Sequence, residues 1–209
     1  MSIEQASKPV VAAFDFDGTL THRDTMFPFL LHAVGMTAFI RNVLMLAPTL
    51  AGYGLGLIRN DIAKERVFTR FLAGMHRDEL SLMATQFAEQ SVPRLLRPEA
   101  MRRLKWHMSQ GHHCVIISAS LENYVQPWAL SVCFDDVIAT RLEILEDGHI
   151  SGKLSGANCF GTEKAKRLEA LLGPRDSYTL YAYGDSSGDR ELLKMADHAY
   201  YRLIPDGEF

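Results

Sequence analysis

Short apolar runs alternate with helical patterns in two parts of the chain. Three runs have the length and apolar content of buried parallel strands: 10–16 (VVAAFDF), 113–118 (HCVIIS) and 178–183 (YTLYAY). Weaker strand patterns occupy 136–145, 149–154 after the turn at 147–148, and 199–203. Helical spacing occurs at 99–109, 123–131, 162–172 and 190–196. This alternation predicts an α/β fold with a doubly wound parallel sheet.

Between the first and second of these strands, the sequence shows only helical spacing. Ile62, Val67 and Phe68 begin an apolar helix face that continues through the next turn. About 70 residues are too many for a simple crossover between parallel strands. We therefore expect an all-helical cap at 24–97, inserted into a Rossmann-like core formed by 1–23 and 98–209.

One segment of the expected cap, residues 35–58, is almost entirely apolar. Pro48 interrupts it, and the run after Asn42 is about 16 residues long, whereas a helix needs about 20 to span a bilayer. One interpretation is a buried helical hairpin, broken at Pro48 or at the glycines of 52–56. The other is an interfacial element that meets lipid.

Composition narrows the class of partner and compartment. The 209 residues carry a net charge of −3 with a pI of about 6.2, so we expect no nucleic-acid partner. The three cysteines are widely spaced and predict neither a disulfide framework nor a zinc site. Residues 1–9 lack the apolar core of a secretory signal, and we expect a cytoplasmic protein.

Polar groups follow each of the three clearest strands, at 15–19, 118–120 and 184–189. The carboxyl ends of parallel strands meet at one edge of a sheet, so these groups can face one crevice. Carboxylates at Asp15 and Asp17 favour an oxygen-rich Mg²⁺ site. Gly18 permits close approach of a phosphate, and Lys164 is a candidate phosphate clamp.

Each of these features has a structural interpretation when taken alone. A lone DxD is common in turns, and Lys164 by itself resembles a solvated helix residue. We interpret Ser120, Asp176 and Asp197 as loop or capping residues, and none of the eight histidines as catalytic. The carboxylates after the first strand, the serine that ends the second, Lys164 and the polar group at 184–189 occur together in this order. This combination indicates a phosphate site far more specifically than any one of them.

Four motifs carry a family resemblance: DFDGTLT (15–21), IISAS (116–120), GTEKAKRL (161–168) and YGDSSGDRELL (183–193). Together they resemble the haloacid dehalogenase superfamily, in its phosphoserine-phosphatase-like branch (subfamily IB) with a helical cap. The resemblance implies a Mg²⁺-dependent phosphatase that hydrolyses a phosphomonoester through an aspartyl-phosphate.

The resemblance also implies a role for each motif residue. Asp15 is the nucleophile and Asp17 the general acid and base. Mg²⁺ is held by the Asp15 carboxylate, the Asp17 carbonyl and Asp185, with Asp189 in support. The implied phosphate contacts are Gly18, Thr19, Ser118, Ala119 and Lys164.

The cap residues depart from the phosphoserine phosphatase pattern. In that family a Glu reads the serine amine and a cap Arg reads the serine carboxylate. Here Asp24 stands in place of the Glu, and Lys64 or Arg66 in place of the Arg, so these three are the candidate substrate contacts. A nearer likeness is to bacterial hydrolases that include phosphatidylglycerophosphatase C, through CFGTEK (159–164), the last motif and PDGE (205–208). The substrate is thus either a small phosphometabolite or a phospholipid head group, the latter with peripheral contact at the inner membrane through 35–58.

Two other classes of function stay open from the sequence. One is a phosphotransferase or mutase of the same fold, and the other is a non-catalytic module that binds a phosphorylated ligand. Fold resemblance alone does not decide among them.

Overall fold

A parallel sheet forms the centre of the computed structural model, which describes residues 8–205. Its five strands lie in the order β3-β2-β1-β6-β7. Their bounds are Val10–Phe14 (β1), His113–Leu121 (β2), Asp136–Thr140 (β3), Thr179–Gly184 (β6) and His198–Tyr201 (β7). The predicted α/β class is confirmed. Most of residues 1–9 and of the PDGE motif lie outside the described residues.

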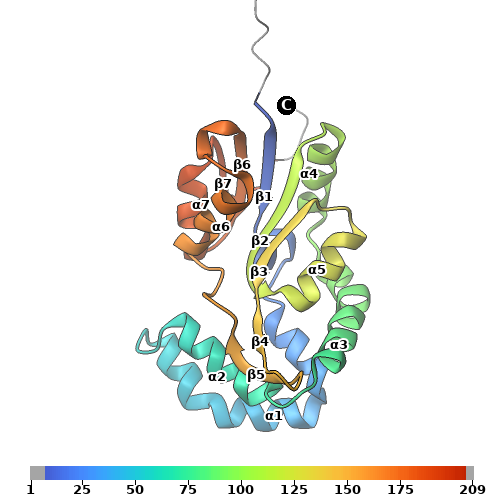
Figure 1. Cartoon of the computed structure of the whole chain (residues 1–209), viewed down its shortest axis with the longest axis vertical. Coiled ribbons are helices and arrows are strands. Elements are labelled where there is room, and N and C mark those ends of the chain that lie inside the picture. The colour runs from blue at the N-terminus through green and yellow to red at the C-terminus, as the bar shows by residue number, and fades with distance from the viewer. Residues whose placement is uncertain (1–7, 206–209) are drawn as a thin grey trace, which may run out of the picture.

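Helices cover both faces of the sheet, as alternation along β1 requires. Val11 and Ala13 pack on the side of α6 (Thr162–Leu172) and α7 (Arg190–Met195). Phe14 points the other way and stacks on Tyr183, with ring centroids 4.5 Å apart. On that side lie α4 (Pro98–Ser109) and α5 (Glu122–Ser131), opposite α6 and α7 in Figure 1.

Three longer helices separate β1 from β2: α1 (Met26–Gly54), α2 (Asn60–Leu72) and α3 (Arg77–Gln90). Helices α1 and α2 lie at the end of the molecule far from the first described residues (Figure 1). An antiparallel hairpin, β4 (Leu142–Ile144) and β5 (Ile150–Leu154), packs against α2. The Ile150 amide donates to the Met75 carbonyl at 2.9 Å. The expectation of an all-helical cap is therefore incomplete, because this hairpin comes from sequence after β3.

Helix α1 differs from the expected buried hairpin in two ways. It continues through Pro48 and ends in the glycine cluster at Gly54, so a break at Pro48 was the wrong alternative. Pro48 lies on the exposed side of the helix, where water can satisfy the carbonyl that loses its partner. The hairpin is also not buried, since Leu44 and Leu55 are 68% and 75% exposed. By length and composition alone, α1 could cross a membrane.

Candidate active site

Asp15 lies directly after β1, at the carboxyl edge of the sheet. Its amide donates to the Tyr183 carbonyl at 2.9 Å, which fixes the backbone to β6. The chain then turns through Gly18, whose φ is +76°. A Cβ atom at Gly18 would lie 2.2 Å from Oδ2 of Asp185. Only glycine therefore fits both the backbone conformation and the adjacent carboxylate.

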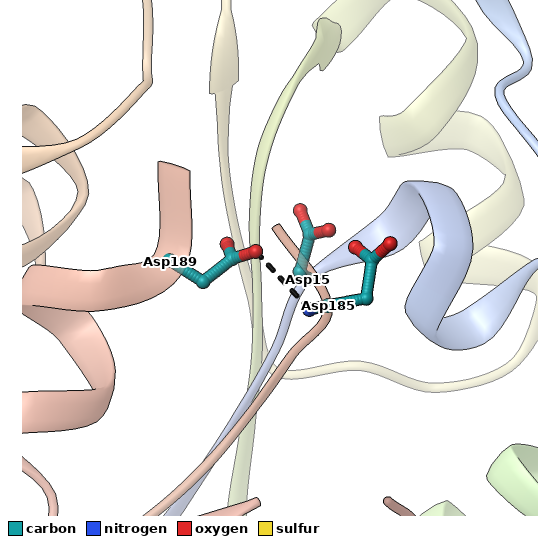
Figure 2. Close-up of side chains that lie close together, drawn as sticks. All are labelled: Asp15, Asp185 and Asp189. Carbon is teal, nitrogen blue, oxygen red and sulfur yellow. Dashed lines mark hydrogen bonds between the residues drawn. The ribbon is translucent and has the colours of Figure 1, made fainter. Parts of the chain in front are cut away.

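Three carboxylates converge at this edge. Oxygens of Asp15, Asp185 and Asp189 lie within 4.8 Å of one another, and they come from the end of β1 and from the loop after β6 (Figure 2). An all-oxygen donor set of this kind fits Mg²⁺ better than a transition metal. The side chain of Asp17 is not in this group.

Lys164, in the first turn of α6, supplies the positive charge. Its Nζ donates to Oδ1 of Asp15 at 2.6 Å and to Oδ1 of Asp189 at 2.5 Å, and the side chain is only 2% exposed. Burial alone would lower the pKa of Lys164, but the two carboxylates raise it above its ordinary value. The ammonium is therefore charged at any physiological pH.

Asp189 fixes the loop that follows β6. Its second oxygen, Oδ2, accepts from the amides of Asp185 at 3.2 Å and Ser186 at 2.9 Å, and from the Ser186 hydroxyl at 2.8 Å. The same carboxylate thus orients both Lys164 and the backbone that carries Asp185. This geometry assigns Asp189 a positioning role.

Burial raises the pKa of Asp15 to about 7, with a further rise from the charge of Asp189 and an opposing effect of Lys164. The unfavourable charge at Asp15 is the reason that a divalent cation beside it would be stabilising. Ionised Asp15 and a bound cation therefore favour each other.

Asp17 points away from the carboxylate group, toward the first cap helix. Its Oδ1 accepts from the Thr25 amide at 3.0 Å and the Thr25 hydroxyl at 2.7 Å. Its Oδ2 accepts a short hydrogen bond from the Ser120 hydroxyl. Burial, and next the nearby charge of Asp24, raises the pKa of Asp17 to about 6. Such a carboxyl can carry a proton near neutral pH.

Sequence reasoning missed the residues that hold Asp17. Ser120 is not a loop or capping residue, because it is buried in β2 and bonded to Asp17. Thr25 was not singled out, although its position before an apolar helical run is a capping signal. The hydroxyls of Thr25 and Tyr124 lie 3.0 Å apart. Nothing in the sequence indicated that Tyr124 would meet Thr25.

Three of the five candidate phosphate contacts line one cavity of about 360 Å³, whereas Thr19 and Lys164 do not line it. Gly18, Ser118 and Ala119 line it together with Asp15 and Asp185. The Ser118 hydroxyl oxygen accepts from the Ser120 amide at 3.0 Å, which leaves its proton for another acceptor.

Thr19 does not line the cavity. Its hydroxyl is buried and has no hydrogen-bond partner within residues 8–205.

The cap forms the other wall of this cavity. Asp24 and Lys64 line it, whereas Arg66 lines a different cavity between α1, α2 and β5. Lys64 Nζ donates to the Ala119 carbonyl at 2.7 Å and to Oδ1 of Asn158 at 3.4 Å. Burial lowers the pKa of Lys64, and the nearby carboxylates oppose that effect. The remaining cap residues at the cavity are Met26, Asn60 and Phe68.

Comparison with known proteins shows the family to which the chain is similar. A family model described as haloacid dehalogenase-like hydrolase matches residues 12–194. The protein CicA of Caulobacter vibrioides is 38% identical over 204 residues, which cover 98% of this chain and 90% of that protein.

Solved structures share the fold. A Bordetella pertussis protein described as having unknown function superposes with a TM-score of 0.78 and 23% identity, covering 90% of this chain and 87% of that one. A phosphoserine phosphatase, described as a phospho-aspartyl intermediate analogue, gives a TM-score of 0.60 and 17% identity, covering 91% and 84%.

Proposed function

The chain belongs to the haloacid dehalogenase-like hydrolase family and is a phosphoric monoester hydrolase, and from this premise we propose that it works through a phosphorylated Asp15 with Mg²⁺. The observation that carries the proposal is the pairing of Lys164 with Asp15 and Asp189 beside Asp185. A buried ammonium at a carboxylate group provides the charge balance that a bound phosphoryl group needs.

In the first step, Oδ2 of Asp15 attacks phosphorus while Lys164 stays on Oδ1. The bond from phosphorus to the ester oxygen breaks, and Asp17 gives its proton to that oxygen as the alcohol leaves. Ser118, with its free hydroxyl proton, donates to a phosphoryl oxygen. Asp15, Asp185 and the carbonyl of Asp17 would hold Mg²⁺, and the bound ion would offset negative charge on the phosphoryl group.

In the second step, Asp17 accepts a proton from water as the water oxygen attacks phosphorus. The bond from phosphorus to Oδ2 of Asp15 breaks, and inorganic phosphate leaves. The pKa of about 6 for Asp17 suits a group that must give and then take a proton.

Cavity size favours a small phosphomonoester as substrate. About 360 Å³ lies at the low end of ligand cavities, roughly 300–1,000 Å³. The walls carry Asp24, Lys64 and Asn60, which suit a polar leaving group. A phospholipid head-group phosphate is the second candidate, and the exposed apolar face of α1 favours it. We propose that the protein is cytoplasmic, whichever of the two substrates it hydrolyses.

Release of phosphate from p-nitrophenyl phosphate tests the proposal, with and without Mg²⁺. We expect Asp15→Asn to lose activity by a factor of about 10⁴ or more, since no nucleophile remains. Asp176→Asn, an exposed carboxylate in a distant turn, is the matched control and should retain full activity. Equal activity of wild type and Asp15→Asn contradicts the proposal. An inactive wild type, with ligand binding retained, favours the non-catalytic module. With a sugar phosphate as substrate in place of p-nitrophenyl phosphate, a phosphorylated isomer rather than free phosphate favours the mutase.

A further inference from the structure

Helix α1 and the turn that follows it carry exposed apolar side chains, which we call the apolar ridge: Met36, Ile40, Leu44 and Met45 on the helix, and Leu55 and Leu57 in the turn. These six side chains are between 51% and 79% exposed. The first three recur every four residues, which places them along one stripe of the helix. Soluble proteins rarely leave so many large apolar side chains together in water without a partner.

The opposite face of α1 is fixed to the rest of the molecule. Phe39 packs against Phe71 of α2, with ring centroids 5.6 Å apart. Asn42 is buried, and its Oδ1 accepts from Arg70 at 3.2 Å. A helix anchored on one side can place its free side in a lipid interface, but it cannot be surrounded by lipid without losing these contacts.

Charge around the ridge has the opposite sign to the rest of the chain. Residues 26–60, which contain the apolar ridge, include two Arg and no Lys, Asp or Glu, a net charge of +2, although the whole chain carries −3. No acidic residue occurs between Asp24 and Asp61, and Arg41 and Arg59 are both exposed. Arg59 also pairs with Asp61 at 2.7 Å, so Arg41 is the main basic side chain beside the ridge. Basic side chains beside an exposed apolar face are complementary to an anionic lipid surface.

The position of α1 suits contact with a flat surface. The helix is kinked at Gly35, where φ is +76°, and the part before the kink is packed in the interior through Phe29 and Leu30. The part after Gly35 lies across the end of the molecule opposite the first described residues (Figure 1). This part, which carries the helical members of the apolar ridge, can therefore face a flat surface.

We propose that the apolar ridge of α1 docks the protein on the surface of an anionic lipid bilayer. The helix lies in the interface, with the ridge among the upper acyl segments and Arg41 and Arg59 at the head groups. A second copy of the chain is a less suitable occupant, because pairing two ridges brings like charges together. The inference does not depend on phosphatase activity.

Flotation with vesicles tests the docking surface. We expect the full chain to float with vesicles that contain phosphatidylglycerol, and at least tenfold less with phosphatidylcholine alone or at high salt. The double substitution Leu44→Glu with Leu55→Glu should lower the partition at least tenfold, since each buried leucine contributes about that factor. Leu82→Glu with Leu130→Glu is the matched control, because these residues are 61% and 65% exposed on α3 and α5.

Each outcome decides the proposal. Wild type that does not float, or equal binding by both double variants and wild type, overturns it. A concentration-dependent dimer that Leu44→Glu with Leu55→Glu abolishes, without vesicle binding, identifies a second copy as the occupant and also overturns it. Hydrolysis of soluble p-nitrophenyl phosphate, measured in parallel, should be unchanged in both variants and verifies folding. Vesicle binding by a protein without phosphatase activity leaves the docking surface intact and contradicts only the proposed function.

Discussion

At the scale of single residues, the site depends on one buried cation held between two carboxylates. Lys164 is bonded to Asp15 and Asp189, and none of the three is exposed by more than 5%. Removing one member of such a group leaves an uncompensated buried charge, which commonly costs about 3–5 kcal/mol. Gly18 is equally constrained, because any side chain at this position would meet the Asp185 carboxylate. The pKa of Asp17 depends on its hydrogen bonds and on the charge of Asp24.

Gly18→Ala should damage the site much more than the fold. The new Cβ would meet the Asp185 carboxylate at 2.2 Å, so Asp185 must move. We expect kcat/KM to fall at least about a hundredfold, as for other misplaced catalytic groups, and the Mg²⁺ requirement to rise. Gly74→Ala is the control, since Gly74 also has positive φ but nothing lies within 4 Å of the added atom. Both variants should lose about 1–2 kcal/mol of stability from backbone strain. Equal activities would contradict the prediction.

Two neighbours of Asp17 should shift the pH profile of kcat in opposite directions. The Thr25 hydroxyl lowers the pKa of Asp17 and the charge of Asp24 raises it. Asp17 must be protonated to release the alcohol, so activity is lost as pH rises through this pKa. Thr25→Val should move the alkaline limb to higher pH, and Asp24→Asn should move it to lower pH. If the alkaline limbs of the Thr25→Val and Asp24→Asn variants shift in the same direction, Asp17 is not the acid.

At the scale of elements, a hydrogen bond from Lys64 links α2 to the strand that carries Ser118. Lys64 reaches from α2 to the Ala119 carbonyl at the end of β2, and also contacts Asn158. The bond crosses from the cap to the strand that carries Ser118. The position of the cap wall relative to the phosphate contacts therefore depends on Lys64.

Lys64→Met should separate substrate binding from stability. Methionine keeps most of the volume but cannot donate, so we expect KM to rise about tenfold from the loss of a charged hydrogen bond. The free energy of unfolding should change by less than about 1 kcal/mol, because a buried ammonium is itself costly. Lys153→Met, at an exposed position of β5, is the control. A large loss of stability with unchanged KM would show that the role is only structural.

The order of elements was predictable because the strands are short apolar runs ended by turns, and the helix 162–172 was predicted to the residue. Contacts between distant elements were not predictable in the same way. The packing of β4 and β5 on α2 joins residues about 80 positions apart, and no local pattern encodes it. The hydrogen bond from Ser120 to Asp17 likewise joins residues far apart in the sequence, and no local pattern indicated it or the bond from Thr25. The family resemblance indicated Asp24 and either Lys64 or Arg66 at the substrate, but helical spacing does not say which of the two basic residues faces the cavity. The structure places Lys64 there.

At the scale of the whole molecule, the buried carboxylates couple folding to pH. Burial raises the pKa of Asp15 to about 7 and that of Asp17 to about 6, from ordinary values of 3.8. As pH rises from about 4 to 7, the unfolded chain loses these protons before the folded protein does. The contribution of both groups to stability is therefore present below about pH 4 and is lost as pH rises through 6 and 7.

Mg²⁺ should reverse this loss, and the gain should depend on pH. The ion binds the ionised carboxylates of the folded protein, so it stabilises by mass action chiefly where Asp15 is charged. We expect a larger rise in Tm on adding MgCl₂ at pH 8 than at pH 5, with NaCl at equal ionic strength as the reference.

The control must separate Asp15 from the other carboxylates of the chain. The pKa of Asp197, for example, is lowered by hydrogen bonds from the Leu180 amide and Arg175, so its contribution to stability increases with pH. The informative quantity is therefore the difference in Tm between wild type and Asp15→Asn, measured at each pH with and without Mg²⁺. The variant lacks one titrating carboxyl group and one proposed Mg²⁺ ligand. The variant should show a flatter metal-free pH dependence and little response to Mg²⁺. An equal Mg²⁺ response at both pH values, or an undiminished response in Asp15→Asn, would place the ion elsewhere than beside Asp15.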